Sequence, residues 1–418
     1  MKTRGTDHED LVQDIVAGRR QLHELPDELP PGVAATVRRR AVAELTGADL
    51  QTVGEYGLDA ARASRRHCEN FIGATQIPLG VTGPLKIRGR WVKEDEILYV
   101  PMATTEGALV ASVNRGCRAL HDAGGAVTRV EDVGITRAPV FRSSGIEETQ
   151  TFLDWVRDNE EEIRRVCEAT SGHLKLVDIK PQTLGTSIYL RFRFETGDAM
   201  GMNMATIACD RVVRDLIEPN TDVQCVALSG NYCVDKKPSA INFLEGRGKK
   251  IYAEVTLDAA TLAKTLKTDA QALVEVQYRK NLMGSIAAGS MGYNAHFANV
   301  LAAVFIATGQ DVAQVVEGAM GVTSVEMRGP DGVFASVYLP DVPLGVVGGG
   351  TALGPQREAL SMLDVAPQPD APGAGALRFA EILGATVLAG ELSLLAAFSS
   401  GDLAGAHERL GRGEIRSQ

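Results

Sequence analysis

The stretch SIYLRFRFE, residues Ser187–Glu195, alternates apolar and polar side chains without interruption. Successive side chains of a β-strand point to opposite faces of a sheet, so this period of two predicts a strand. Its two faces would hold Ile188, Leu190, Phe192 and Phe194 on one side, and Ser187, Tyr189, Arg191, Arg193 and Glu195 on the other. We therefore expect a half-buried strand whose polar face is turned toward solvent.

The segments on either side of this strand predict a small ferredoxin-like domain. In chain order we expect a strand over 139–142, a helix from Ser144, strands over 174–179 and 187–195, a helix over 200–217 and a last strand over 223–228. The order strand, helix, strand, strand, helix, strand is typical of ferredoxin-like domains. We therefore predict an α+β fold in which residues 138–228 form an inserted domain.

The rest of the 418-residue chain predicts a larger domain that this insertion interrupts. Residues 66–137 and 229–398 would form it, with a strand over 250–257 and apolar helices over 295–308 and 376–398. Residues 1–65 are rich in Arg, Ala, Leu and Glu and predict an N-terminal helical segment. Residues 399–418 form a polar C-terminal segment.

Charge and cysteine content narrow the class of protein. The formal net charge of −10 disfavours nucleic acid as a partner, because a polyanion requires a basic face. Six scattered cysteines, no C-x-x-C pair and a polar, acidic start favour reduced thiols and a cytoplasmic location. The longest apolar run, near 300–307, is far shorter than the roughly 18 residues of a membrane span, so no membrane is expected.

Two segments suggest binding chemistry, and each has a purely structural alternative. In GDAMGMNMAT (197–206) a strand gives way to a helix, whose first N–H groups suit a pyrophosphate; the alternative is a tight turn with packed methionines. No G-x-G-x-x-G or P-loop pattern occurs. In SGNYCVDKKPSAINFLEGRGKK (229–250), Lys236 or Lys237 could polarise a carbonyl beside Asp235, or form a solvated charge run.

Three single residues have the same two interpretations. Glu106 either interacts with a helix dipole or acts as a carboxylic acid in apolar surroundings. Asp311 follows an apolar helix and is either a functional acid or, as the structural alternative, a cap or a member of an ion pair. His407 is an exposed histidine of the tail unless it has a partner.

Taken together, these segments resemble the soluble, prokaryotic class I 3-hydroxy-3-methylglutaryl-coenzyme A (HMG-CoA) reductases. The resemblance runs from about residue 69 to 411. It rests on ENFIGATQIPLGVTGPL (69–85), PMATTEGALVASVNRGCRAL (101–120), GITRAPVFR (134–142), DAMGMNMAT (198–206), SGNYCVDKKPSAINFLEGRGK (229–249), NAHFAN (294–299), GQDVAQVVEG (309–318), VGGGTALGPQ (347–356) and LAGELSLLAA (388–397).

The resemblance implies the four-electron reduction of HMG-CoA to mevalonate and CoA with two NADPH, for isoprenoid biosynthesis, without a metal. Lys236 would stabilise the oxyanion, Glu106 would donate a proton, and Asp311 would hold both in one network. His407, on a mobile C-terminal segment, would protonate the departing CoA thiolate. The large domain would bind HMG-CoA and the small domain NADPH. The family also implies a homodimer or a dimer of dimers, with active sites between subunits.

The same resemblance assigns the binding residues. Substrate would be held by Arg137, Ser229, Asp235, Lys237, His296 and Asn299, with Arg137 and Lys237 on its free carboxylate. The nicotinamide cofactor would be held by Ser171, Asp198, Met200, Gly201, Met202, Asn203, Gly348, Gly349, Gly350 and Thr351.

One departure leaves the choice of cofactor open. Relatives have an arginine for the 2′-phosphate after the serine that corresponds to Ser171, and Gly172 stands there instead. His173 and Lys175 could supply the charge, so NADH stays an alternative to NADPH. Alternative functions are the oxidative direction, a non-catalytic CoA-binding protein and the reduction of another acyl-CoA.

Overall fold

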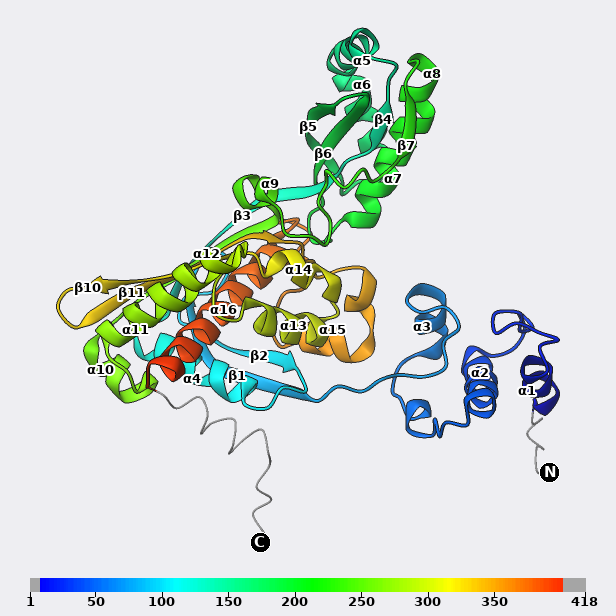
Figure 1. Cartoon of the computed structure of the whole chain (residues 1–418). Coiled ribbons are helices and arrows are strands. Elements are labelled where there is room, and N and C mark those ends of the chain that lie inside the picture. Colours follow the sequence, from blue (N-terminus) through cyan, green and yellow to red (C-terminus); the bar gives the residue numbers. More distant parts are fainter. Residues whose placement is uncertain (1–7, 401–418) are drawn as a thin grey trace.

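The computed structural model describes residues 8–400 of the chain. Figure 1 shows three parts along it: a group of N-terminal helices, a large central body and a small domain that rises from one end of that body. An extended stretch joins the N-terminal helices to the body.

The N-terminal part consists of three helices with two small cores of their own. They are α1 (Glu9–Val16), α2 (Pro31–Thr46) and α3 (Ala60–Arg66). Pro31 suits the first helical position of α2, and Gly47, at φ 72°, ends that helix in the left-handed conformation. One core contains Val12, Ile15, Val37 and Ala41, and the other Ala35, Ala63 and Phe71.

The large body packs helices around a mostly antiparallel sheet. Its strands are β1 (Leu79–Arg88), β2 (Ile97–Ala103), β3 (Ala126–Arg137), β8 (Arg247–Leu257), β9 (Gly292–Tyr293), β10 (Gly321–Arg328) and β11 (Gly332–Val342). Its helices are α4 (Leu109–Asp122), α9 (Ala240–Glu245), α10 (Ala259–Thr261), α11 (Ala270–Val276), α12 (Ser285–Ala288), α13 (Phe297–Thr308), α14 (Val315–Gly318), α15 (Gly354–Ser361) and α16 (Ala374–Ser400).

The small domain has the predicted ferredoxin-like order of elements. They are β4 (Val140–Arg142), α5 (Ile146–Asp158), α6 (Glu160–Glu168), β5 (Lys175–Leu184), β6 (Ser187–Glu195), α7 (Met202–Val212), α8 (Glu218–Asn220) and β7 (Gln224–Ala227). The antiparallel pairs β7–β4, β4–β6 and β6–β5 make one sheet. The α+β fold with an inserted β-α-β-β-α-β unit is therefore confirmed.

Strand β6 corrects one sequence-based expectation. Ile188, Leu190, Phe192 and Phe194 are fully buried, as predicted. The opposite face was expected to be solvated, yet Arg191 and Arg193 are only 1% and 7% exposed. The reason is Glu245, which terminates α9 and pairs with Arg191 Nη1 at 2.8 Å and with Arg193 Nη2 at 2.9 Å. A carboxylate from a distant segment thus allows the polar face to be buried.

Strand β3 belongs to both parts and makes their sheets continuous. It pairs with β8 of the body and, at its end, with β6 of the small domain. The change of partner falls at Gly134, whose φ is 75° and where a Cβ would lie 2.7 Å from the carbonyl oxygen of Phe194. Glycine is required there. Arg137, the last residue of β3, therefore lies at the junction of the two parts.

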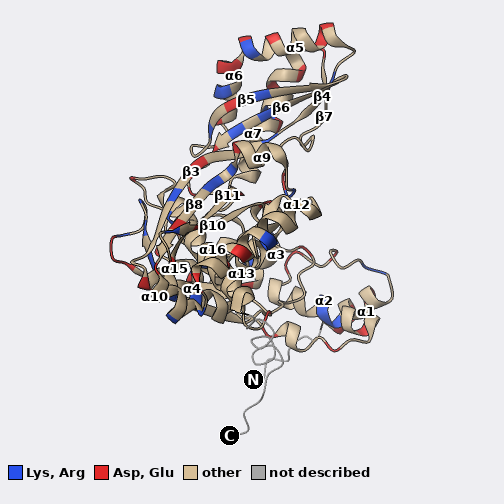
Figure 2. Ribbon diagram, turned by 60° about the vertical axis from the view of Figure 1, so that its left-hand side comes forward, with Lys and Arg blue, Asp and Glu red and all other residues tan. Residues whose placement is uncertain are grey.

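The outer helices of the small domain form a solvated surface. Figure 2 shows acidic and basic residues side by side on α5 and α6. Some of them are paired, as in the contacts of Arg157 with Asp154 at 2.8 Å and of Arg164 with Glu160 at 3.2 Å. Such exposed pairs contribute little to stability.

Helix α16 is the central helix of the body. By length and composition it could cross a membrane, but 83% of its most apolar window is buried inside the fold. It crosses α4 so closely that a Cβ on Gly116 would lie 1.9 Å from the carbonyl oxygen of Ala389. It also carries buried Arg378, Glu381 and Glu391, each hydrogen-bonded within the protein. These properties describe a core helix.

The two glutamates of α16 connect it to neighbouring backbone. Glu381 accepts hydrogen bonds from the N–H groups of Arg90, Trp91 and Val92 at 2.8–3.1 Å. Glu391 accepts from the N–H groups of Ala295 and His296 at 2.8 and 2.7 Å and from Thr323 Oγ1 at 2.6 Å. Glu391 thereby sets the entry into α13.

Replacing Glu391 with alanine is expected to lower the free energy of unfolding by about 3 kcal/mol or more. The reason is that buried Thr323 Oγ1 and two partly buried backbone N–H groups would lose their acceptor, at about 1–3 kcal/mol each. Urea unfolding followed by circular dichroism measures the change. Glu358→Ala, at an exposed position on α15, is the matched control. A loss below about 1 kcal/mol for Glu391→Ala would contradict the assigned contacts.

Candidate active site

Lys236 and Asp311 form an ion pair although 75 positions separate them in the chain. Lys236 Nζ lies 2.8 Å from Asp311 Oδ2, and both side chains are partly exposed. The hydrogen bond and the negative charge of Asp311 raise the pKa of Lys236 above its ordinary value. The lysine is therefore a fixed cation at neutral pH. The sequence proposed both residues for the site, and the fold brings them together.

Asp311 is both a helix cap and a member of an ion pair, which are the two structural interpretations of this residue. Helix α13 ends at Gly309, which has a left-handed φ of 70°. Two residues later, Asp311 Oδ1 accepts the N–H of Ala313 at 3.1 Å and caps the short helical turn Val312–Gln314. Its other oxygen, Oδ2, is the one that meets Lys236. The cap thus holds the carboxylate in place for the ion pair.

Arg247 is the centre of a buried network beneath the Lys236 loop, and the sequence analysis missed it. Its guanidinium is fully buried and lies 2.7 Å from Asp235 Oδ1 and 3.1 Å from Glu317 Oε1. Gln314 Nε2 also donates to Asp235 at 3.1 Å. Asp235, expected to bind substrate, therefore has two partners within the protein. Arg247 and Glu317 both lie inside the quoted motifs, but nothing local indicates that they are buried.

Burial changes the protonation of the carboxyl groups in this network. Loss of solvent and the nearby Asp341 raise the pKa of Glu317 to about 8. Burial likewise raises the pKa of Asp341 to about 7, against the opposing effect of Arg247. The nearby guanidinium groups oppose these shifts but do not outweigh the loss of solvent, so both carboxyl groups are weaker acids than they would be in water.

The Lys236–Asp311 pair lines a cavity of about 950 Å³. Most of the proposed cofactor residues line the same cavity, together with Arg137. From the sequence-based set the lining includes Arg137, Met200, Gly201, Met202, Asn203, Asp235, Lys236, Asp311, Gly348, Gly349, Gly350 and Thr351. His67, Gln310 and Gln314 line it too and were not anticipated. A fixed cation thus faces a space large enough for an extended ligand.

Two backbone segments make this cavity suitable for a dinucleotide. A Cβ on Gly348 or Gly349 would meet nothing within 4 Å, so the backbone there is open to close approach, whereas Gly350 packs against Gly309. Gly201, at φ 93°, precedes α7, and a Cβ there would lie 2.3 Å from Thr196 Cγ2. The first N–H groups of α7 are the kind of donors that bind phosphate. The residues present therefore fit a phosphorylated cofactor.

Asp198, another proposed cofactor residue, has its carboxylate bound by the protein itself. Oδ2 accepts the N–H of Gly373 and Oδ1 that of Ala376, both at 3.0 Å. Its carbonyl oxygen accepts the N–H of Val346 at 2.8 Å. Asp198 thus ties the loop before α7 to the start of α16 and to the glycine segment, and it does not line the cavity among the described residues.

The comparisons with known proteins place the chain in a family. The profile described as hydroxymethylglutaryl-coenzyme A reductase matches residues 34–412, more than nine-tenths of the chain. The chain belongs to the hydroxymethylglutaryl-coenzyme A reductase family. Within that family, the cavity and its ion pair lie among the motifs that suggested the resemblance.

Relatives named 3-hydroxy-3-methylglutaryl-coenzyme A reductase are similar to it along their whole length. The protein of Methanothermobacter thermautotrophicus is 49% identical over 405 residues, covering 96% of this chain and 100% of its own. That of Pyrococcus abyssi is 47% identical over 407 residues, covering 97% and 99%. A solved structure titled as the class II reductase of Streptococcus pneumoniae bound to NADPH matches with a TM-score of 0.65 at 15% identity, covering 94% and 97%. That likeness shows the shared fold of the reductase family.

Glu106 and Asn299 form a second pair outside the described lining of this cavity. Asn299 Nδ2, in the first turn of α13, donates to Glu106 Oε1 at 3.1 Å. Glu106 is exposed between β2 and α4. His296 donates its backbone N–H to Glu391, and its buried Nε2 has no hydrogen-bond partner among residues 8–400. Among residues 8–400, the hydrogen-bond partner given for the Glu106 side chain is thus Asn299, and Glu106 is not part of the described cavity lining.

The remaining proposed residues have local contacts. Ser229 Oγ lies 3.4 Å from Cys233 Sγ, and Lys237 Nζ donates to the carbonyl oxygen of Asp235 at 3.3 Å. Ser171 Oγ accepts the N–H of His173 at 3.2 Å in the loop between α6 and β5. His407 lies outside the described residues.

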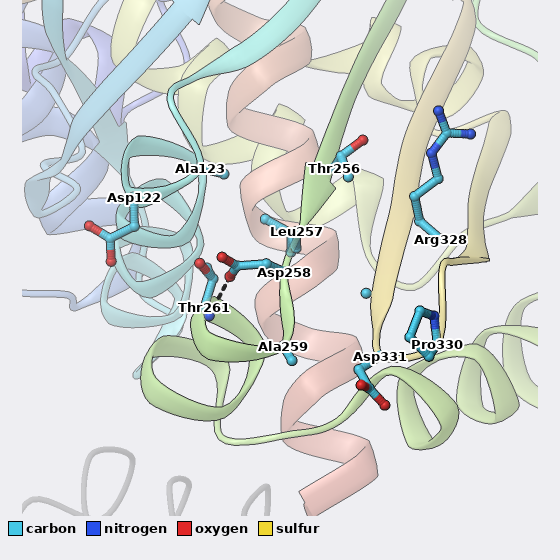
Figure 3. A pocket seen from close by; sticks show the side chains of 11 residues that line it. Asp122, Ala123, Thr256, Leu257, Asp258, Ala259, Thr261, Arg328, Pro330 and Asp331 are labelled. Atoms are coloured by element: carbon cyan, nitrogen blue, oxygen red, sulfur yellow. Dashed lines mark hydrogen bonds between the residues drawn. The ribbon is translucent and has the colours of Figure 1, made fainter.

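Figure 3 shows another hollow of this reductase, which carries none of the proposed site residues. It measures about 450 Å³ and is lined by the end of α4, the end of β8 and the turn between β10 and β11. Asp258 lies in it, but its carboxylate accepts the N–H of Thr261 at 2.8 Å and so caps α10. We therefore interpret this hollow as a gap on the protein surface, where the ends of α4 and β8 meet the turn between β10 and β11.

Proposed function

We propose that this chain reduces HMG-CoA to mevalonate and free CoA with two molecules of NADPH. Family membership over nearly the full length, together with a lysine–aspartate pair facing a large glycine-lined cavity, carries the proposal. The reaction balances with two hydrides and two protons: the first of each converts the thioester to mevaldehyde and CoA thiol, and the second reduces the aldehyde to the alcohol.

Lys236 acts on the carbonyl oxygen of the substrate in this proposal. NADPH supplies the hydrides. As negative charge develops on the carbonyl oxygen, the ammonium of Lys236 stabilises it from inside the cavity, an effect that is often the largest in catalysis. Asp311 keeps that ammonium charged and in place. Arg137, at the junction of the two parts, is suited to the free carboxylate of the substrate, although it now donates to Thr206 Oγ1 at 3.0 and 2.7 Å.

Proton transfer falls to Glu106 and His407. Glu106 donates to the carbonyl oxygen, with Asn299 holding its carboxyl group. His407 protonates the CoA thiolate as it leaves. Substrate contacts are assigned to Ser229, Asp235, Lys237, His296 and Asn299, and cofactor contacts to Ser171, Asp198, Met200, Gly201, Met202, Asn203, Gly348, Gly349, Gly350 and Thr351.

A homodimer, or a dimer of dimers, would complete this site across the subunit interface. The exposed side chains of Leu79, Val81, Ile97 and Tyr99 give the β1–β2 hairpin an apolar surface suited to a second copy. Glu106 lies just beyond this hairpin, so a neighbouring chain could bring another Lys236 to it.

We further propose that the enzyme is of class I and works in the cytoplasm. The class is inferred from the long motifs that carry the resemblance, such as PMATTEGALVASVNRGCRAL (101–120) and SGNYCVDKKPSAINFLEGRGK (229–249). The small domain would hold NADPH, the large domain HMG-CoA, and residues 399–418 would carry His407 to the site.

A cofactor assay tests the proposed function. Purified protein is mixed with HMG-CoA, the oxidation of NADPH and of NADH is followed separately, and released CoA is titrated. Two NADPH consumed per CoA support the proposal and indicate that His173 and Lys175 compensate for Gly172. Faster NADH oxidation would keep the reaction and change the cofactor. No oxidation by a folded protein that binds HMG-CoA would reject it.

His407→Gln is expected to lower kcat with HMG-CoA by about 100-fold while affecting the reduction of free mevaldehyde much less. Only the thioester releases a thiolate that needs a proton. Steady-state assays on both substrates measure the difference, with His121→Gln, on the surface of α4, as the control. Equal losses on the two substrates would count against this role.

A further inference from the structure

Glu317 is a fully buried carboxyl group in direct contact with the loop that carries Lys236. It lies on α14, next to the sheet, and its side chain has no exposed surface. Its Oε1 accepts the backbone N–H of Lys236 at 3.0 Å and a hydrogen bond from Arg247 Nη1 at 3.1 Å. The reaction proposed above assigns Glu317 no part.

The backbone of Lys236 needs a partner that holds it. Its φ is 59°, in the left-handed region that residues with a Cβ rarely adopt. Asn231 and Val234, in the same loop, also have positive φ, at 63° and 51°. Three such residues within six positions store strain that the surroundings must offset. The hydrogen bond from Lys236 N to the buried Glu317 does this at the residue whose side chain pairs with Asp311.

We propose that Glu317 is a positioning residue: by accepting the backbone N–H of Lys236, it holds that residue in the left-handed conformation that directs its ammonium to Asp311 and the cavity. The proposal rests on the function proposed above, because that function makes Lys236 the oxyanion-stabilising group. Glu317 itself touches neither the cavity nor the reacting atoms among the described residues.

The protonation of Glu317 fits this task and suggests a conservative replacement. Its second oxygen, Oε2, is buried without a hydrogen-bond partner among residues 8–400, as is Oδ1 of Asp341. Burial, and Asp341 next, raise its pKa to about 8. A protonated carboxyl accepts through its carbonyl oxygen, and the amide of glutamine has the same shape and the same acceptor. Glutamine should therefore preserve the contact with Lys236.

Hydrogen exchange at the Lys236 amide, measured by mass spectrometry, tests the anchoring without any turnover. Glu317→Ala is expected to speed exchange of that amide at least tenfold, whereas Glu317→Gln should stay within twofold of the wild type. Asp341→Asn is the matched control, since Asp341 shares the buried network but does not contact Lys236. Glu317→Met fills the same volume without an acceptor and carries the test if Glu317→Ala does not fold.

Kinetics provides the second arm. Glu317→Ala and Glu317→Met are expected to lower kcat about 10- to 100-fold, because a misplaced catalytic group costs that much, while KM for HMG-CoA stays within about threefold. Glu317→Gln should restore kcat. Unchanged exchange in the alanine and methionine variants, or a glutamine variant as impaired as they are, would overturn the proposal. If the wild-type protein oxidises no cofactor, the proposed function is rejected. The hydrogen-exchange experiment would still test, independently of turnover, whether Glu317 anchors the backbone of Lys236.

Discussion

Lys236→Ala should reduce kcat for HMG-CoA reduction by about 10²–10³-fold or more, with the fold intact. The ammonium is the fixed positive charge that Asp311 holds at the cavity, at 2.8 Å. Without it, the developing oxyanion would lose the charge that stabilises the transition state more than the ground state. Asp311 would also become an unpaired carboxylate that repels that oxyanion.

Steady-state kinetics with HMG-CoA and with mevaldehyde measures this loss. Lys264→Ala, at an exposed position of the body, is the matched control, and circular dichroism checks the fold. Lys236→Arg tests the geometry separately from the charge. It keeps the positive charge but replaces the compact ammonium with a planar guanidinium, so we expect partial activity. Turnover of Lys236→Ala within tenfold of the wild type would remove Lys236 from the mechanism.

Arg247→Met should lower the free energy of unfolding by about 3–5 kcal/mol, the usual cost of removing one partner from a buried ion pair. The guanidinium is fully buried and contacts Asp235 at 2.7 Å and Glu317 at 3.1 Å. Methionine fills part of the volume but leaves these carboxyl groups without a cation. Because Asp235 lines the cavity and Glu317 holds the Lys236 backbone, activity should fall as well.

The size of this loss should depend on pH in a predictable direction. Glu317 and Asp341 have folded-state pKa values raised to about 8 and about 7, so the folded chain binds more protons than the unfolded chain between about pH 4 and pH 8. Stability from these groups therefore falls as pH rises, and losing Arg247 steepens that fall. We expect Arg247→Met to be less destabilised at pH 6 than at pH 8.5.

Urea unfolding at pH 6 and pH 8.5 measures the loss in the free energy of unfolding and how that loss changes with pH. Arg279→Met is the control, because Arg279 pairs with Glu275 at the protein surface. A loss below about 1 kcal/mol at pH 8.5, or a larger loss at pH 6 than at pH 8.5, would contradict the role assigned to Arg247.

Local pattern was enough to predict the small domain. Period-two alternation in 187–195 depends on the burial of one face of the strand, and one-sided burial leaves a signature in neighbouring residues. The same rule failed for Arg191 and Arg193, since their burial depends on Glu245, about 50 positions away. Nothing in the local sequence indicates that Glu381 and Glu391 are buried in an apolar helix, because the backbone N–H groups that bind their carboxylates come from distant segments.

By itself, the sequence determined the α+β class, the inserted ferredoxin-like unit and the residue types that could bind and reduce a thioester. Those features follow from short-range periodicity and from long motifs. Only the tertiary structure decided that Lys236 meets Asp311, that Asp198 caps α16, and that Glu317 and Arg247 support the Lys236 loop. Electrostatic pairing and the pKa shifts caused by burial depend on which distant segments pack together. No short segment of the sequence contains that information.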